Sequence, residues 1–158
     1  MTSRIMLAGL IEITLPDRTL RLCDGGFVYF KGEKFASEDP LFGTIGEAEA
    51  VEESVGDDAP AWTMTFLPKS TAAATELSQP GHQNSHIRGW LVEVDPVTGI
   101  ADEASAELVS DMLLDTTELI PGRDGRRLEV GMISWCERLF TINEGNTLNA
   151  RFHKTIWP

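Results

Sequence analysis

Short runs in which apolar and polar residues alternate, each closed by a turn sequence, constrain this chain more than any other feature. Residues 10–15, 19–23 and 27–30 are rich in branched or aromatic side chains, and turns containing proline or glycine separate them. Alternation of period two places every second side chain on one face of a strand. The three runs therefore predict a three-stranded β-meander over residues 6–36.

The clearest amphipathic strand begins at Trp62. Trp62, Met64 and Phe66 alternate along it with Thr63 and Thr65. Neighbouring residues of a strand point to opposite faces. We therefore expect the three large apolar side chains to face a core and the two threonines to face away from it.

One short helix is expected over residues 70–78. Three consecutive alanines favour it, Ser70 is positioned as its N-cap, and Pro80 and Gly81 end it. Residues 101–113 fit either a helix or a strand. We favour a strand there, because the residues that follow continue the same apolar pattern.

Further strand-like runs make the predicted fold mainly β. They cover residues 48–54, 86–94, 118–120, 128–136 and 147–157. Trp90 and Trp135 fall within two of these runs, and both are expected in the core. The openings at 9–13 and 89–94 resemble each other. The chain is therefore expected to form either one compact β unit over 1–158 or two small β subdomains, 1–80 and 81–158.

The acidic residues are unevenly distributed along the chain. The net charge is −12 at pH 7, and residues 35–68 and 89–122 each contain eight acidic side chains and no Lys or Arg. A surface of this sign repels phosphate, which argues against nucleic-acid binding and against attachment to anionic membranes. The acidic residues can also be explained without any binding function, as side chains that keep the protein soluble.

Cys23 and Cys136 are the only cysteines, too few for a disulfide scaffold. Each lies in an apolar strand-like run, so both are expected to be reduced thiols in the core. The apolar run at residues 5–11 is not followed by a small-residue cleavage site, and no run reaches the length of a membrane span. We expect synthesis in the cytoplasm and no membrane binding by this chain.

His82 and His86 have the four-residue spacing that places two zinc ligands on one face of a helix. The turn-forming residues around them predict a loop instead, and Gln83 stands where the metalloprotease signature has its general-base Glu. We expect a solvated loop and no metal.

No catalytic site is predicted. The acidic pairs at 52–53, 57–58 and 102–103 are sequence neighbours, which point to opposite faces of a strand or lie in turns. The chain has no nucleophile elbow, no phosphate-binding glycine loop and no dinucleotide fingerprint. His153 is the His nearest to Cys136, at a spacing that does not indicate a dyad. We expect neither enzyme activity nor a cofactor.

The order of features along the chain resembles that of a known family. An apolar opening strand at 10–13 is followed by a second strand and turn at 20–26 and by a hairpin at 30–35. Two strands, a short helix over 70–77 and a strand over 89–95 come next. This order is similar to the N-terminal part of the hub, or minor tail, proteins of lambda-like siphophages and gene-transfer-agent particles. In the hairpin, Phe30 stands where that family usually has Trp, and Phe35 where it usually has Tyr.

The resemblance implies a tail-tube-like β-barrel or β-sandwich fold and a place in the virion, at the tail tip. It implies a homo-oligomeric ring, with a trimer as the expected form, in contact with the distal tail protein, the tape measure and the tail fibre or tip proteins. DNA would pass through the ring without specific binding. The candidates for acidic side chains that face this lumen are Glu47, Glu49, Glu53, Asp57 and Asp58.

The chain departs from the lambdoid relatives in having no Cys-rich metal-binding C-terminal region. It is therefore expected to be either naturally short or one piece of a longer protein, and its tail position can be the hub, the distal tail or an adaptor. The alternative function is a peripheral carbohydrate- or receptor-binding β module of the tail, in which Trp62, Trp90 or Trp135 would stack on a sugar. A small hydrolase is a third interpretation, and no candidate site supports it.

Overall fold

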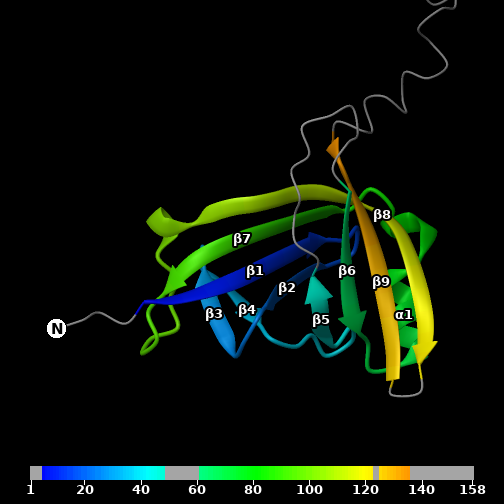
Figure 1. The fold of residues 1–158 in the computed structure, drawn as a ribbon, viewed down its shortest axis with the longest axis horizontal. Coiled ribbons are helices and arrows are strands. Elements are labelled where there is room, and N and C mark those ends of the chain that lie inside the picture. Colours follow the sequence, from blue (N-terminus) through cyan, green and yellow to red (C-terminus); the bar gives the residue numbers. More distant parts are fainter. Residues whose placement is uncertain (1–4, 49–60, 123–124, 136–158) are drawn as a thin grey trace, which may run out of the picture.

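A single nine-stranded sheet contains every strand that the structure describes. The computed structural model describes residues 5–48, 61–122 and 125–135 (Figure 1). The strands are β1 (Met6–Thr14), β2 (Thr19–Cys23), β3 (Phe27–Phe30), β4 (Glu33–Ala36), β5 (Thr44–Ala48), β6 (Ala61–Leu67), β7 (His86–Val94), β8 (Glu107–Gly122) and β9 (Gly125–Ser134). Helix α1 (Thr71–Leu77) and two short 3-10 turns, Pro80–His82 and Glu103–Ser105, complete these elements. The predicted mainly β fold with one short helix is confirmed for the described residues.

The strand order in the sheet is β3-β4-β2-β1-β7-β8-β9-β6-β5. The predicted meander over residues 6–36 is therefore wrong, because β4 lies between β3 and β2. Lys31 and Gly32 both have positive φ, at 52° and 77°. This geometry is typical of the two-residue turn that joins adjacent antiparallel strands, so β3 pairs with β4. The β4 strand in turn meets β2 in parallel, where Leu22 lies opposite Ala36.

The long strand β8 bends the sheet. Its first part pairs with β7 from Glu107 to Leu113, and its second part pairs with β9 from Met112 to Gly122. A register shift between Leu114 and Thr116 interrupts the second ladder, and a bulge of this kind bends a strand and increases its twist. In Figure 1, β1, β2 and β7 follow the long axis of the molecule while β6 and β9 cross that direction steeply. The sheet therefore curls over its own inner face.

Two apolar clusters lie on opposite faces of β1. The inner cluster fills the space inside the curl, where Ile11 and Ile13 of β1 pack with side chains of β2, β6 to β9 and α1. The outer cluster contains Leu10 and lies on the other face, between β1, β7 and the β3–β4 hairpin. Burial on both faces explains why the β1 sequence is almost continuously apolar.

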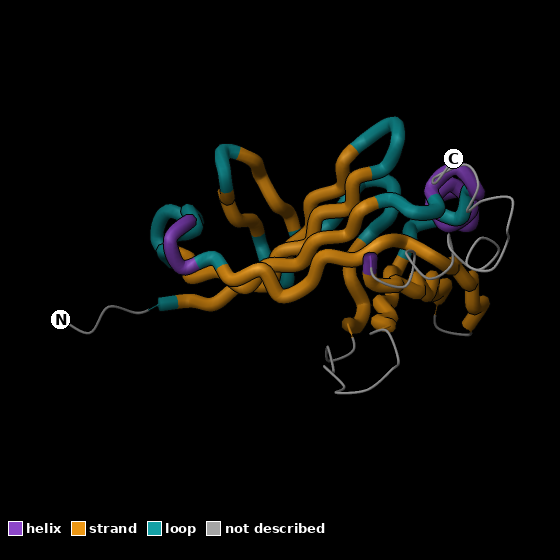
Figure 2. Tube along the Cα trace, turned by 90° about the horizontal axis from the view of Figure 1, so that it is seen from above, coloured by secondary structure: helices purple, strands orange, loops and turns teal. Residues whose placement is uncertain are grey.

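Helix α1 closes the inner cluster at the end of the molecule opposite the start of β1 (Figures 1 and 2). Ala74 and Leu77 of α1 are buried in that cluster. The predicted N-cap is confirmed, because Ser70 Oγ accepts a hydrogen bond from the Ala73 amide at 3.2 Å. The favoured strand within 101–113 is also confirmed, since β8 begins at Glu107 after a 3-10 turn.

The two similar sequence openings are neighbours in the sheet. Strand β1 pairs with β7 along its whole length, and Leu10 lies opposite Trp90. The predicted strand at 147–157 lies outside the described residues, as does all of the predicted strand at 48–54 except Ala48, the last residue of β5.

Candidate functional site

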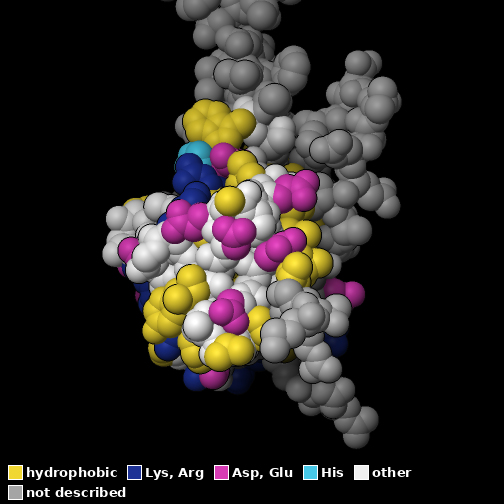
Figure 3. All heavy atoms as spheres, turned by 90° about the vertical axis from the view of Figure 1, so that its left-hand side faces the viewer, with side chains coloured by type: hydrophobic (Ala, Val, Ile, Leu, Met, Phe, Trp, Pro, Cys, Tyr) yellow, Lys and Arg dark blue, Asp and Glu magenta, His cyan; other side chains and the backbone are white. Residues whose placement is uncertain are grey.

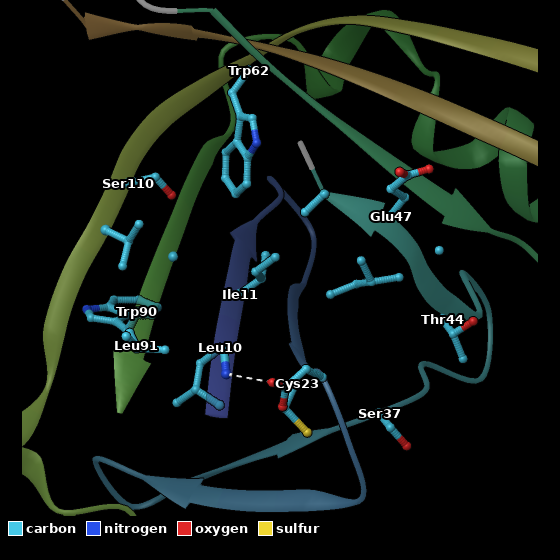
Figure 4. A pocket seen from close by; sticks show the side chains of 17 residues that line it. Leu10, Ile11, Cys23, Ser37, Thr44, Glu47, Trp62, Trp90, Leu91 and Ser110 are labelled. Atoms are coloured by element: carbon cyan, nitrogen blue, oxygen red, sulfur yellow. Dashed lines mark hydrogen bonds between the residues drawn. The ribbon is translucent and has the colours of Figure 1, made fainter. Parts of the chain in front are cut away.

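A groove of about 670 Å³ opens on the inner face of the sheet, and we call it the inner groove. Strands β1, β7 and β8 form one side, and β5, the last strand of the sheet order, forms the other (Figure 4). The described residues that line it are Gly9, Leu10, Ile11, Cys23, Asp24, Ser37, Thr44, Ile45, Gly46, Glu47, Ala48, Trp62, Gly89, Trp90, Leu91, Val109 and Ser110. The groove borders the inner cluster, because Ile11 and Trp62 belong to both.

Gly9 keeps the floor of the groove low, and Gly89 leaves room for the Ser110 side chain. Gly9 lies opposite Leu91, and Gly89 lies opposite Ile11, in the antiparallel pairing of β1 with β7. A Cβ atom at Gly9 would meet nothing closer than the Asp24 carboxylate at 3.8 Å, so the space above this residue is open. A Cβ atom at Gly89 would approach Ser110 Oγ to 2.6 Å. The Ser110 side chain therefore occupies the place that a larger residue at position 89 would take.

Ser110 and Trp62 form the upper wall of the groove. Both are buried, and in Figure 4 the Ser110 hydroxyl and the Trp62 ring point into the groove. The Ser110 hydroxyl has no hydrogen-bond partner in the part of the chain that the structure describes. Burial of a hydroxyl without a partner is unfavourable, and such groups in native proteins call for an explanation.

The charged side chains among the described lining residues are both acidic, namely Asp24 and Glu47. The Gly9 amide donates a hydrogen bond of 3.1 Å to the Asp24 carboxylate, which holds this carboxylate at the groove. Burial raises the pKa of the neighbouring Cys23 thiol, and the Asp24 charge acts in the same direction. Cys23 is therefore a neutral thiol at pH 7, and the two carboxylates set the sign of the local potential.

Part of the apolar lining of the groove is exposed, and this exposed strip continues past the groove at Leu7. Leu7, Leu91 and Val109 are all exposed. In the sheet register Leu7 lies opposite Glu93, and Leu91 lies opposite Glu107, so the two carboxylates share the face of the two leucines. Figure 3 looks onto the end of the molecule where β1 begins, and hydrophobic and acidic side chains lie side by side there.

One of the five predicted lumen-facing residues is described by the structure. Glu47 is exposed in β5 and lines the inner groove. The other four, Glu49, Glu53, Asp57 and Asp58, lie outside the described residues. The orientation of these four carboxylates stays a prediction.

Trp62, Met64 and Phe66 are buried in the inner cluster, with exposed fractions of 8%, 0% and 1%. Thr63 and Thr65, on the other face of β6, are each half-buried. The side chains on the Trp62 face are therefore more buried than the two threonines, as the sequence alternation predicts.

The other two tryptophans differ from each other. Trp90 is half-buried against the outer cluster, with ring centroids 5.7 Å from Phe30 and 6.4 Å from Phe35. Trp135, which we predicted in the core, is 45% exposed, so that prediction is wrong. Trp135 follows the last residue of β9, so it lies beyond the hydrogen-bonded ladder that fixes side chains on one face of the sheet or the other. The centroid of its ring lies 5.4 Å from that of His86.

The predicted solvated loop is wrong for His82, which is buried. Its Nδ1 atom lies 3.4 Å from the Leu77 carbonyl oxygen, and its Nε2 atom lies 3.7 Å from a carboxylate oxygen of Asp17. His86 belongs to β7 and contacts Asp111 at 3.4 Å. The two histidines therefore have separate structural roles.

Within residues 5–48, 61–122 and 125–135, no cluster of three or more His, Cys, Asp and Glu side chains is arranged to hold a metal ion. No helix in this part of the chain has the length and apolar character needed to cross a membrane.

No protein-family model matches the chain, and no curated protein matches it in sequence. Among solved structures, the fold is similar to that of a chain in the virion of a native gene transfer agent (GTA) particle, with a TM-score of 0.58 and 20% sequence identity. The match covers 85% of this chain and 42% of that chain, so this chain spans less than half of the neighbour's length. What the two chains share at this identity is the fold.

Proposed function

We propose that this chain is a structural protein of a tailed, phage-like particle and that it forms a hub or baseplate ring at the tail tip. The observation that carries the proposal is the fold shared with a chain of a gene transfer agent virion, over 85% of the present chain. The sequence order of strands, hairpin and helix, which resembles that of tail hub proteins, supports the proposal independently of that match.

The ring would form through contacts between copies of the chain, with the distal tail protein, the tape measure and the fibre or tip proteins as neighbours. The described sheet ends in two strands, β3 and β5, and the outer edge of a terminal strand offers backbone groups for pairing. The β3 edge is partly occupied, because Tyr29 exchanges backbone hydrogen bonds with the segment 99–101. Contacts between copies would therefore use surfaces other than the β3 edge.

The acidic residues of the chain suit a protein that lines a DNA conduit. A ring repeats each carboxylate by symmetry, and a negative wall does not retain the phosphates that pass it. Glu47 is exposed in β5, next to the acidic sequence 49–60. In this proposal the chain carries no catalytic function.

An electron-microscopy reconstruction of the intact particle tests this function. The expected result is that several copies of this chain form a ring, with a trimer as the first expectation, between the tail tube and the tip. Density for the chain in the capsid, or as single copies on the outside of the tail, would contradict the ring.

The second candidate function is a peripheral carbohydrate- or receptor-binding module. Phe27 and Tyr29 favour it, since both are exposed on β3 and their rings pack edge to face at 5.8 Å. Lys34 lies 5.3 Å from the centre of the Phe27 ring. Titration with surface polysaccharide of the host should show binding that Phe27→Ala abolishes if this function is the correct one.

A further inference from the structure

We propose that the inner groove docks a segment of a partner protein in which a large apolar side chain stands next to Lys or Arg. The inference stands on the geometry and charge of the groove and does not depend on the tail-tip function.

The size and walls of the groove suit an apolar side chain. Its volume of about 670 Å³ lies within the usual range for binding sites. The floor is low at Gly9, and the side chains of Ile11, Leu91 and Trp62 are among those that line the groove. The exposed Leu7 and Leu91 extend the apolar surface outward, so a segment longer than one residue can remain in contact with it.

The Ser110 hydroxyl supplies a polar group that the fold itself leaves without a hydrogen bond among the described residues. Apolar binding sites commonly contain a few polar groups that orient the ligand. The hydroxyl is buried at the groove wall, so a donor or acceptor that enters the groove would reach it after rotation of the side chain about its Cα–Cβ bond. In this proposal the unsatisfied hydroxyl is one of the polar groups that orient the bound segment.

The charge of the surroundings selects a cationic partner. Asp24 and Glu47 line the groove, and Glu93 and Glu107 lie on the same face as the apolar strip. The described lining residues include no Lys or Arg. Opposite charges across an interface accelerate association and exclude partners of the wrong sign.

The β5 strand gives an extended partner segment a place to align. Thr44 to Ala48 all line the groove, and β5 ends the described sheet. Addition of a strand to such an edge combines backbone hydrogen bonds with pockets for alternate side chains. The inner groove would receive one of those side chains.

Three acetylated, amidated pentapeptides test the proposal by titration followed with NMR amide shifts. The first alternates lysine with leucine (KLKLK), the second replaces leucine by serine (KSKSK), and the third replaces lysine by glutamate (ELELE). We expect KLKLK to bind at least about tenfold more tightly than KSKSK, because leucine burial adds to the charge attraction. We expect ELELE not to bind. The amide shifts should cluster at Gly9, Gly89 and Ser110.

Gly9→Leu fills the groove and should reduce the affinity for KLKLK to that for KSKSK. The space above Gly9 is open, and its φ is compatible with a side chain, so folding should be preserved. Gly81→Leu is the matched control, because it introduces the same side chain in a 3-10 turn where a Cβ meets nothing within 4 Å. If Gly9→Leu fails to fold, Leu91→Lys at the exposed strip replaces it and should weaken KLKLK binding in the same way.

Three outcomes would overturn the proposal. Equal affinity for KLKLK and KSKSK would show that net charge alone drives binding. Amide shifts centred on Phe27 and Tyr29 would place the site elsewhere. Self-association of the wild-type chain in sedimentation, lost in Gly9→Leu, would assign the groove to a second copy of this chain.

Discussion

Phe66 is the residue at which the amphipathic pattern of β6 can be tested most directly. Its side chain is 1% exposed in the inner cluster. Truncation of a fully buried Phe removes its burial and leaves a cavity, so Phe66→Ala should destabilise the protein by about 3–5 kcal/mol in urea denaturation. Thr65→Ala on the other face should change the stability by no more than about 0.5 kcal/mol. A loss below about 1 kcal/mol for Phe66→Ala would mean that the faces are assigned wrongly.

The buried hydroxyl of Ser110 should lower the free energy of unfolding. Its buried hydroxyl has no partner among the described residues, so Ser110→Ala removes an unsatisfied group without leaving another one. We expect a gain of about 1 kcal/mol in the free energy of unfolding. The matched control is Ser105→Ala, which should be destabilising, because Ser105 Oγ accepts a hydrogen bond from the Glu93 amide and donates one to the Asp102 carbonyl. A loss of stability in Ser110→Ala would show that the hydroxyl is satisfied in solution.

Between β4 and β5, the turn at Gly43 positions the strand that borders the groove. Gly43 has a φ of +79°, and an added Cβ would overlap the Leu67 carbonyl group at the end of β6. Gly43→Ala should therefore combine a conformational cost of about 1–2 kcal/mol with a steric clash. Gly26→Ala separates the two effects, since Gly26 also has positive φ, at +62°, but no atom within 4 Å of the added Cβ. Thermal unfolding should show a clearly larger loss for Gly43→Ala, and equal losses would contradict the close packing of this turn.

How far the sequence predicts each element depends on how local its determinants are. The β6 strand and the Ser70 cap are indicated by residue patterns only a few positions long, and both were predictable. The place of β4 between β3 and β2 was not, because strand order depends on pairing between distant segments. The bend in β8 depends on a β-bulge near Leu114. This bulge is not visible in the alternation of apolar and polar residues along the sequence.

The inner groove was not predictable for the same reason. Its floor joins Gly9 to Gly89, and its carboxylates come from positions 24 and 47. Each of these residues has an ordinary local explanation as a turn, strand or surface residue. Only the pairing of β1 with β7 and the curl of the sheet bring them together.

At the scale of the whole molecule, the pairing of β1 with β7 links the two halves of the chain. It joins nine residue pairs, from Met6 opposite Val94 to Thr14 opposite His86. We therefore expect one cooperative unfolding transition with coincident fluorescence and circular dichroism curves. Fragments 1–80 and 81–158, expressed separately, should not fold. Two separated transitions, or a folded fragment, would support two subdomains instead.

The last prediction concerns the acidic surface of the proposed ring. Within a regular strand Glu47 and Glu49 share one face, and Glu47 is exposed. If this face lines a DNA conduit, the double variant Glu47→Lys and Glu49→Lys should assemble into particles with normal tails but deliver DNA poorly, because cationic walls retain the passing phosphates. The matched control is the double variant Glu103→Lys and Glu118→Lys, which changes the net charge equally at two other exposed carboxylates and should leave delivery intact. Because Glu47 also lines the inner groove, Gly9→Leu separates the two roles: it fills the groove without any change in charge and should not retain DNA. Normal delivery by the Glu47 and Glu49 variant, or an equal defect in the control, would leave solubility as the explanation for these carboxylates.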